Sequence, residues 1–290
     1  MKYAFFPGCS LETTAWDFAR SVRSVSAALG IELEDIPAWV CCGSTPAHAS
    51  NASLATALPV LNLQKAQAMG RPVMTACASC YARLRTANHR VHGDAAERDR
   101  LERITGAGYD GDVEVLHVVD VLVNRLGVAA IRARVKRPLS GLRVACYYGC
   151  LLSRPPEIVA FDDPENPTCL DELVIAAGAD CVSWPYKTEC CGASLSMSEP
   201  AVVNRLGHRL LSMARQAGAE CIVVACPLCQ MNLDLRQRDA TAAHGELPET
   251  PVLYVTQLLG LALGLSAKEL GLGALTIRAE GLLERMKVEG

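Results

Sequence analysis

The chain has 290 residues, half of them hydrophobic, which is enough for one large domain or two of ordinary size. Its 28 basic and 31 acidic side chains give a net charge of −3, which argues against binding nucleic acid by neutralising phosphates. Aromatic residues make up only 5%, too few to favour a surface that stacks on bases. The conspicuous feature is the presence of 14 cysteines.

The apolar stretches are too short for membrane or export segments. The N-terminus reaches Gly8 and Cys9 after a few apolar residues, which is too short for the apolar region of a secretory signal. The most apolar stretch, 252–265, has about 14 residues, and a membrane-spanning helix needs roughly 20. We therefore expect a cytoplasmic protein without a transmembrane segment. Disulfides are rare in that compartment, so the cysteines suggest metal or redox chemistry.

Short apolar runs alternate with helical patterns along the first half of the chain. Helical spacing of apolar residues, with glycine stops, predicts helices over 14–29 and 51–69 and a third after Cys77 through His89. Strands are expected at 3–6, 31–36 and 71–76.

The second half repeats this alternation. Strands are expected at 143–147, 181–184 and 220–225, and a helix over 200–216. The basic, acid-free segment 125–137 is interpreted as the linker between the halves. The proline-rich segment 153–168 is interpreted as a loop inserted in the second half only.

Three cysteine motifs of the first half recur in the second. Cys-Cys-Gly at 41–43 recurs 149 residues later, and so does Cys-x-x-Cys at 77–80. The aromatic run ending in Gly8-Cys9 recurs 141 residues later, and the proline-rich insertion accounts for most of the smaller offset. We predict two copies of one unit, with a first domain over 1–135 and a second over 140–290.

Alternating strands and helices predict an α/β fold. We expect two tandem domains related by a pseudo-two-fold axis, each with a short, mostly parallel sheet flanked by helices. The cysteines would then follow the carboxyl ends of strands, where open α/β sheets bind their ligands.

Each copy contributes five cysteines, and no histidine shares the repeat. Five thiols exceed the four ligands of a tetrahedral zinc site and are one more than a cubane [4Fe-4S] cluster needs. Neighbouring thiolates such as Cys41 and Cys42 suit a larger cluster, because each can reach a different iron. Two sulfur-rich metal sites follow, with an expanded iron–sulfur cluster preferred over zinc or copper(I).

The doubled pattern resembles the cysteine-rich CCG domain, and the two-copy chain is similar to the B-type subunit of heterodisulfide reductase. Gly149-Cys150 followed by Arg154-Pro155 also fits that family. The resemblance implies one non-cubane [4Fe-4S] cluster per motif, each held by five cysteines. The implied ligands are, for one cluster, Cys9, Cys41, Cys42, Cys77 and Cys80, and for the other, Cys150, Cys190, Cys191, Cys226 and Cys229.

The resemblance further implies an oxidoreductase that acts on sulfur groups. A disulfide R–S–S–R′ would enter a cleft between the two clusters and be cleaved in two one-electron steps. The chain has no cubane motif and no glycine-rich dinucleotide fingerprint, so its electrons must come from partners. The implied partners are a small cubane [4Fe-4S] subunit and a flavoprotein.

Three alternatives stay open. The chain could relay electrons as the CCG subunit of a flavin-linked lactate, glycolate or succinate oxidoreductase. It could belong to a sulfur-oxidising variant of the same complex, with a disulfide or persulfide as substrate. One of the two motifs could hold zinc instead of a cluster.

Other side chains are weaker candidates. Cys146 is the one rival ligand, four residues before Cys150, but we expect it to be an ordinary core or loop thiol. The same expectation covers Cys169, Cys181 and Cys221. His48 could donate a proton, although a surface histidine is the commoner case. Lys187 could steer an anionic substrate, although a solvated lysine is commoner.

Overall fold

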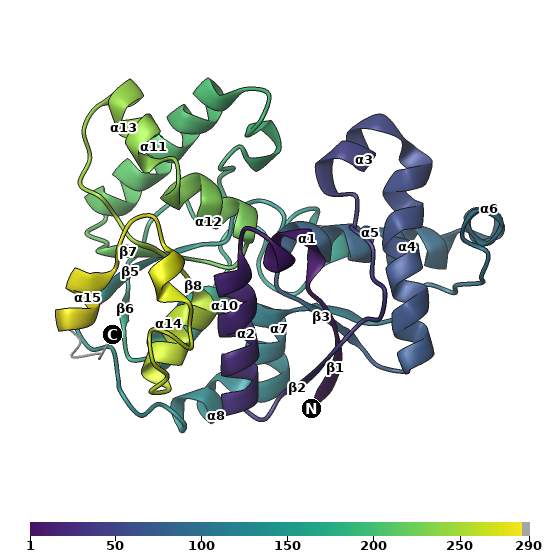
Figure 1. Cartoon of the computed structure of the whole chain (residues 1–290), viewed down its shortest axis with the longest axis horizontal. Coiled ribbons are helices and arrows are strands. Elements are labelled where there is room, and N and C mark those ends of the chain that lie inside the picture. Colours follow the sequence, from purple (N-terminus) through teal and green to yellow (C-terminus); the bar gives the residue numbers. More distant parts are fainter. Residues whose placement is uncertain (286–290) are drawn as a thin grey trace.

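The computed structural model describes residues 1–285, which form two α/β halves, each around its own parallel sheet (Figure 1). In the first half the strands hydrogen-bond in the order β2-β1-β3-β4. All pairs are parallel, with Phe5 opposite Asp35 and Met74 opposite Leu116. The bounds are β1 Lys2–Phe6, β2 Glu32–Asp35, β3 Val73–Thr75 and β4 Val115–His117.

The sheet of the second half has the same order, β6-β5-β7-β8, and is also parallel throughout. This confirms the predicted α/β class and the tandem arrangement. The bounds are β5 Arg143–Tyr147, β6 Asp180–Cys181, β7 Cys221–Val224 and β8 Val252–Tyr254. The predicted strand 181–184 is shorter than expected, because only Asp180 and Cys181 pair with β5.

Helices flank both sheets (Figure 1). In the first half they are α1 Gly8–Glu12, α2 Trp16–Ala28, α3 Ser44–Ser50, α4 Ala52–Met69, α5 Ala78–Gly93, α6 Ala95–Thr105, α7 Val118–Asp120, the π-helical η1 Val121–Gly127 and α8 Val128–Arg132. In the second they are α9 Pro156–Val159, α10 Cys169–Ala176, the 3-10 helix η2 Ala193–Leu195, α11 Pro200–Gln216, α12 Pro227–Asp234, α13 Gln237–His244, α14 Val255–Ala262, the 3-10 helix η3 Leu272–Ala274 and α15 Glu280–Arg285.

Local sequence explains where the long helices begin and end. The Asn51 side chain caps α4 by accepting hydrogen bonds from two backbone N–H groups, and Gly70 ends that helix in the left-handed region. Asp94 caps α6 in the same way. The segment 125–137, expected as a linker, is largely helical and packs through α8 against α10.

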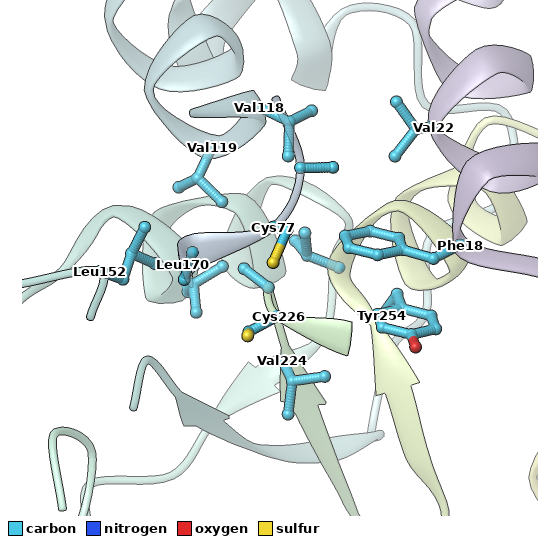
Figure 2. Packing of buried hydrophobic residues seen from close by; sticks show 14 of the residues in the cluster. Phe18, Val22, Cys77, Val118, Val119, Leu152, Leu170, Val224, Cys226 and Tyr254 are labelled. Carbon is cyan, nitrogen blue, oxygen red and sulfur yellow. The ribbon is translucent and has the colours of Figure 1, made fainter. Parts of the chain in front are cut away.

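The two halves pack directly on each other. Helix α2 of the first half lies against α14 of the second, where the Phe18 and Tyr254 rings stack with centroids 3.9 Å apart (Figure 2). Next to this stack, the hydroxyls of Ser21 and Thr256 are 2.7 Å apart. The inserted segment 153–168 also reaches the first half, because Tyr81 Oη of α5 donates to the Val159 carbonyl at 2.9 Å. Within residues 1–285, no helix has the length and apolar character to cross a membrane.

Candidate functional site

Five cysteines of the first half line one cavity, which lies beyond the carboxyl ends of its strands. Cys9 lies in α1 directly after β1, the Cys41-Cys42 pair follows β2, and the Cys-x-x-Cys pair bounds the start of α5 after β3. The strand order therefore brings together thiols that are far apart in the sequence. They are Cys9, Cys41, Cys42, Cys77 and Cys80.

The second half builds its own five-cysteine cavity from the equivalent elements. Its thiols follow β5, β6 and β7, and the Cys-x-x-Cys pair again bounds the start of a helix, α12. They are Cys150, Cys190, Cys191, Cys226 and Cys229.

The sulfur atoms pair in the same pattern in both cavities. Cys9 lies 3.8 Å from Cys41 in the first, and Cys150 lies 4.0 Å from Cys190 in the second. The other close pairs, measured between Sγ atoms, are Cys42 to Cys80 at 3.4 Å and Cys191 to Cys229 at 3.7 Å.

Hydrogen bonds among the crowded thiols raise the pKa of some and lower the pKa of others. For Cys80, hydrogen bonds with Cys42 and Cys77 raise the pKa well above its usual range, and burial adds to the effect. For Cys229, hydrogen bonds with Cys191 and Cys226 and burial do the same. Three thiols of each set are buried, and five thiolates around one cavity would repel each other unless cations compensated their charge. The donor set therefore fits a sulfur-ligated metal group, whose iron would supply that charge.

Glycine precedes the first cysteine of each half because a side chain there would strike a sulfur. Gly8 has φ +70°, and a Cβ on it would lie 2.8 Å from Cys80 Sγ. Gly149 has φ +68°, and a Cβ on it would lie 3.0 Å from Cys229 Sγ. The left-handed backbone and the close approach both require glycine.

The two cavities meet at residues that are equivalent in the repeat. Cys77 and Cys226 face each other across the boundary between the halves (Figure 2), and hydrogen bonding with Cys226 is the largest effect raising the pKa of Cys77. Thr45 and Ser194, also 149 positions apart, have hydroxyls 3.1 Å apart.

One pair of equivalent residues also forms a shared wall. Ser79 and Leu228 each precede the last cysteine of a Cys-x-x-Cys pair, and both line both cavities. Equivalent residues in mutual contact place the pseudo-two-fold axis between the cavities. The two sites are therefore neighbours across a thin wall.

The cavities differ in size. The first has a volume of about 510 Å³, with an apolar side formed by Pro46, Leu54 and Leu58 from α3 and α4. The second has a volume of about 40 Å³ and is the more enclosed.

The rival ligand Cys146 lines neither cavity. It is buried on β5 with its Sγ 3.6 Å from Cys181 Sγ, and Cys181 in turn contacts Asp171 Oδ1 at 3.0 Å. Lys187 Nζ lies 2.7 Å from that same oxygen. We therefore do not interpret Cys146, Asp171 and Cys181 as a metal site, because the ammonium group already neutralises the carboxylate where a cation would bind.

The same contacts account for Lys187, which the sequence offers as a residue that could steer substrate. Its ammonium group also donates to the Pro167 carbonyl at 3.0 Å, its side chain is only 12% exposed, and it lines neither cavity. These contacts direct the ammonium group to Asp171 and Pro167 and not into either cysteine cavity.

His48 is exposed on α3 and does not line the first cavity. The positive charge of Arg83 is the main cause that lowers its pKa, followed by burial and Arg90. Arg83 is a charged residue near this site that the sequence pattern did not single out.

Comparison with known proteins decides the family. The cysteine-rich domain named CCG matches residues 3–85 and 144–234, one segment in each half. The chain is also 34% identical over 280 residues to the B-type subunit of the ferredoxin/F(420)H(2)-dependent CoB-CoM heterodisulfide reductase of Methanosarcina acetivorans, covering 93% of this chain and 92% of that protein. The chain belongs to the family of heterodisulfide reductase B-type subunits.

Two other relatives are similar to this chain over nearly their whole length. The 8-methylmenaquinol:fumarate reductase membrane anchor subunit of Wolinella succinogenes is 35% identical over 284 residues, 97% of this chain and 99% of that protein. A protein of Archaeoglobus profundus, named as similar to the heterodisulfide reductase B-type subunit, is 30% identical over 291 residues. The match covers 97% of this chain and 96% of that protein. Membership makes the chain an iron–sulfur protein of an oxidoreductase family.

A solved structure shares the fold. A hypothetical protein from Helicobacter pylori superposes with a TM-score of 0.76 at 14% identity, over 96% of this chain. The match spans 52% of the Helicobacter chain, about half its length.

Proposed function

We propose that this chain is the catalytic iron–sulfur subunit of a heterodisulfide reductase-like complex and reductively cleaves a disulfide between two non-cubane [4Fe-4S] clusters. The observation that supports this is the meeting of two five-thiol cavities at a pseudo-two-fold axis. The proposed ligands are Cys9, Cys41, Cys42, Cys77 and Cys80 for one cluster, and Cys150, Cys190, Cys191, Cys226 and Cys229 for the other.

The net reaction needs two electrons and two protons, and R–S–S–R′ leaves as RSH and R′SH. When bound, the clusters would supply the electrons one at a time. The chain's own part is to hold two electron-carrying sites on either side of one wall, formed by Ser79 and Leu228. Two sites this close can each receive one sulfur, so no free thiyl radical has to leave the protein.

The electrons must reach the chain from elsewhere in a complex. The proposed donors are a small cubane [4Fe-4S] subunit and a flavoprotein, since the sequence contains neither a cubane motif nor a dinucleotide fingerprint. The name of the Methanosarcina relative, which refers to ferredoxin, is consistent with this. We also propose that the protein is cytoplasmic and that its two domains span residues 1–135 and 140–290, as expected from the sequence.

One relative favours a second candidate function. The Wolinella protein belongs, by its name, to a quinol:fumarate reductase, and it is as similar to this chain as the disulfide reductase subunits are. In that case the chain would relay electrons to a partner and cleave no disulfide.

Two measurements on the complex purified without oxygen separate these functions. Iron and acid-labile sulfide should each reach about eight per chain, whereas two zinc ions without sulfide would reject both redox functions. Addition of a mixed disulfide to the oxidised complex should then change the paramagnetic signal of a cluster, and thiol should appear under reducing conditions. A signal unchanged by every disulfide and thiol tested, with full iron content, would favour the relay.

A further inference from the structure

One position near the cysteines carries a different charge in the two halves. Arg83 lies in α5, three residues after Cys80, and its equivalent in the repeat is Asn232 in α12, three residues after Cys229. Residues three apart on a helix share a face, so both side chains lie on the side of the helix that carries the last cysteine.

The contacts of Asn232 show where this position points. Its Nδ2 lies 3.1 Å from the Cys191 carbonyl and 3.7 Å from Cys191 Sγ. Cys42 is the equivalent of Cys191 in the first half. The repeat therefore directs Arg83 towards Cys42.

Two observations agree with that direction. The positive charge of Arg83 is the main cause that lowers the pKa of His48 in α3, the helix that follows the Cys41-Cys42 pair, so the guanidinium lies on this side of α5. Arg83 Nε is buried and has no hydrogen-bond partner among residues 1–285. The guanidinium thus lies beside the first cavity, and no carboxylate of the described part of the chain is paired with it.

A second position strengthens the difference. The residue before the Cys-Cys pair is Val40 in the first half and Glu189 in the second. Glu189 directly precedes the proposed ligand Cys190, so it places a negative charge near the second set of cysteines. Glu189 is exposed, so water and salt screen its charge more than that of Arg83.

We infer that Arg83 makes the first cluster the more easily reduced of the two. Reduction adds one negative charge to a cluster, and a fixed, partly buried positive charge stabilises that form more than the neutral Asn232 does. Arg83 acts through its positive charge and is not itself an iron ligand. The inference rests on the proposed function only in requiring a cluster in each half.

The two sites, which have the same backbone fold, would therefore have different roles in the reaction. The electron that arrives first is held at the first cluster until the second electron is available. The first site also has the larger of the two cavities, about 510 Å³. The first electron is therefore held at the site with more room for a ligand.

The test is a redox titration of the complex, followed by electron paramagnetic resonance, with iron content measured on every sample. Arg83→Gln should lower the ratio of reduced to oxidised first cluster about tenfold at fixed potential, which is a shift of about 59 mV for one electron. Arg83→Lys should leave the potential of the first cluster close to its wild-type value.

Asn232→Arg should raise the potential of the second cluster, and Glu189→Gln should raise the same potential by less. Cys42→Ala identifies the signal of the first cluster by removing it.

The outcomes separate the inference from the proposed function. Full iron content with unchanged potentials in Arg83→Gln overturns the inference alone. If Arg83→Gln loses iron, the Asn232→Arg variant tests the inference instead. An iron-replete Asn232→Arg sample in which the potential of the second cluster is unchanged also overturns the inference. A wild-type complex with no cluster in one half overturns both. Potentials that shift as expected in a complex that cleaves no disulfide leave the inference standing and remove the proposed function.

Discussion

The two halves share a backbone plan but differ in the side chains around it. Sheet order, the spacing of the close sulfur pairs and the glycine before the first cysteine are repeated. Cavity volume and the residue pair Arg83 and Asn232 are not. Holding a five-thiol group constrains the main chain, because the sulfur positions depend on strand ends and turns. Charge and cavity walls are free to diverge, so the two sites can take different parts in one reaction.

The largest effect should come from removing one thiol of the buried pair in each half. Cys42→Ala and Cys191→Ala should each lower iron from about eight to about four per chain, because each half holds its cluster independently. Iron analysis and paramagnetic resonance of anaerobically purified protein measure this. Cys146→Ala is the matched control and should keep all the iron. Loss of a cluster in that control would mean that the ligand set of the second half is wrong.

The glycines before Cys9 and Cys150 should come next. Gly8→Ala and Gly149→Ala push a methyl group to within 2.8 and 3.0 Å of a sulfur, so iron should fall in the half concerned, more for Gly8. Gly30→Ala has a similar φ, +75°, with nothing within 4 Å, and should cost about 1 kcal/mol of stability without loss of iron. Equal iron in all three variants would show that the close approach is unimportant.

A pH dependence should arise where α2 meets α14. Burial raises the pKa of Asp17 to about 6, against the hydrogen bond from Gln257. A raised carboxyl pKa stabilises the fold at low pH, and this contribution is lost as pH rises through about 6. Asp17→Asn should therefore be more stable than wild type by about 2 kcal/mol at pH 8, with a smaller gain at pH 5.5.

Thermal unfolding midpoints of both proteins at the two pH values measure this. A gain that is the same at both pH values would contradict the assignment to Asp17.

The smallest effect concerns the contact made by the inserted segment. Tyr81→Phe removes the hydrogen bond to the Val159 carbonyl and should cost about 1 kcal/mol in denaturant unfolding. Tyr186→Phe is the control, because its hydroxyl bonds only with an exposed arginine, Arg209, among residues 1–285, and its effect should be near zero. A neutral Tyr81→Phe would show that the insertion adds no stability through this bond.

Much of the fold could be predicted from the sequence because it depends on local spacing. The motif offset predicted the duplication, and helix periodicity with glycine stops predicted α2, α4 and α11. Strands β4 and β8 were not predicted, since each has three fully buried residues that run directly into a helix and show no alternation. Helices α3, α6 and α13 were missed, the last two being too polar for a clear apolar stripe.

By itself, the sequence determined the doubled set of five cysteines and the α/β alternation that puts them after strand ends, because both follow from order along the chain. Tertiary structure alone decided which distant groups meet. Cys146 stays inside β5, whereas the left-handed turn at Gly149 carries Cys150 into the cavity. Equivalent residues of the repeat, 149 positions apart, meet at one axis only because the two halves pack on each other. Arg83 and Cys42, 41 positions apart in the sequence, are brought near each other only by the packing of helices.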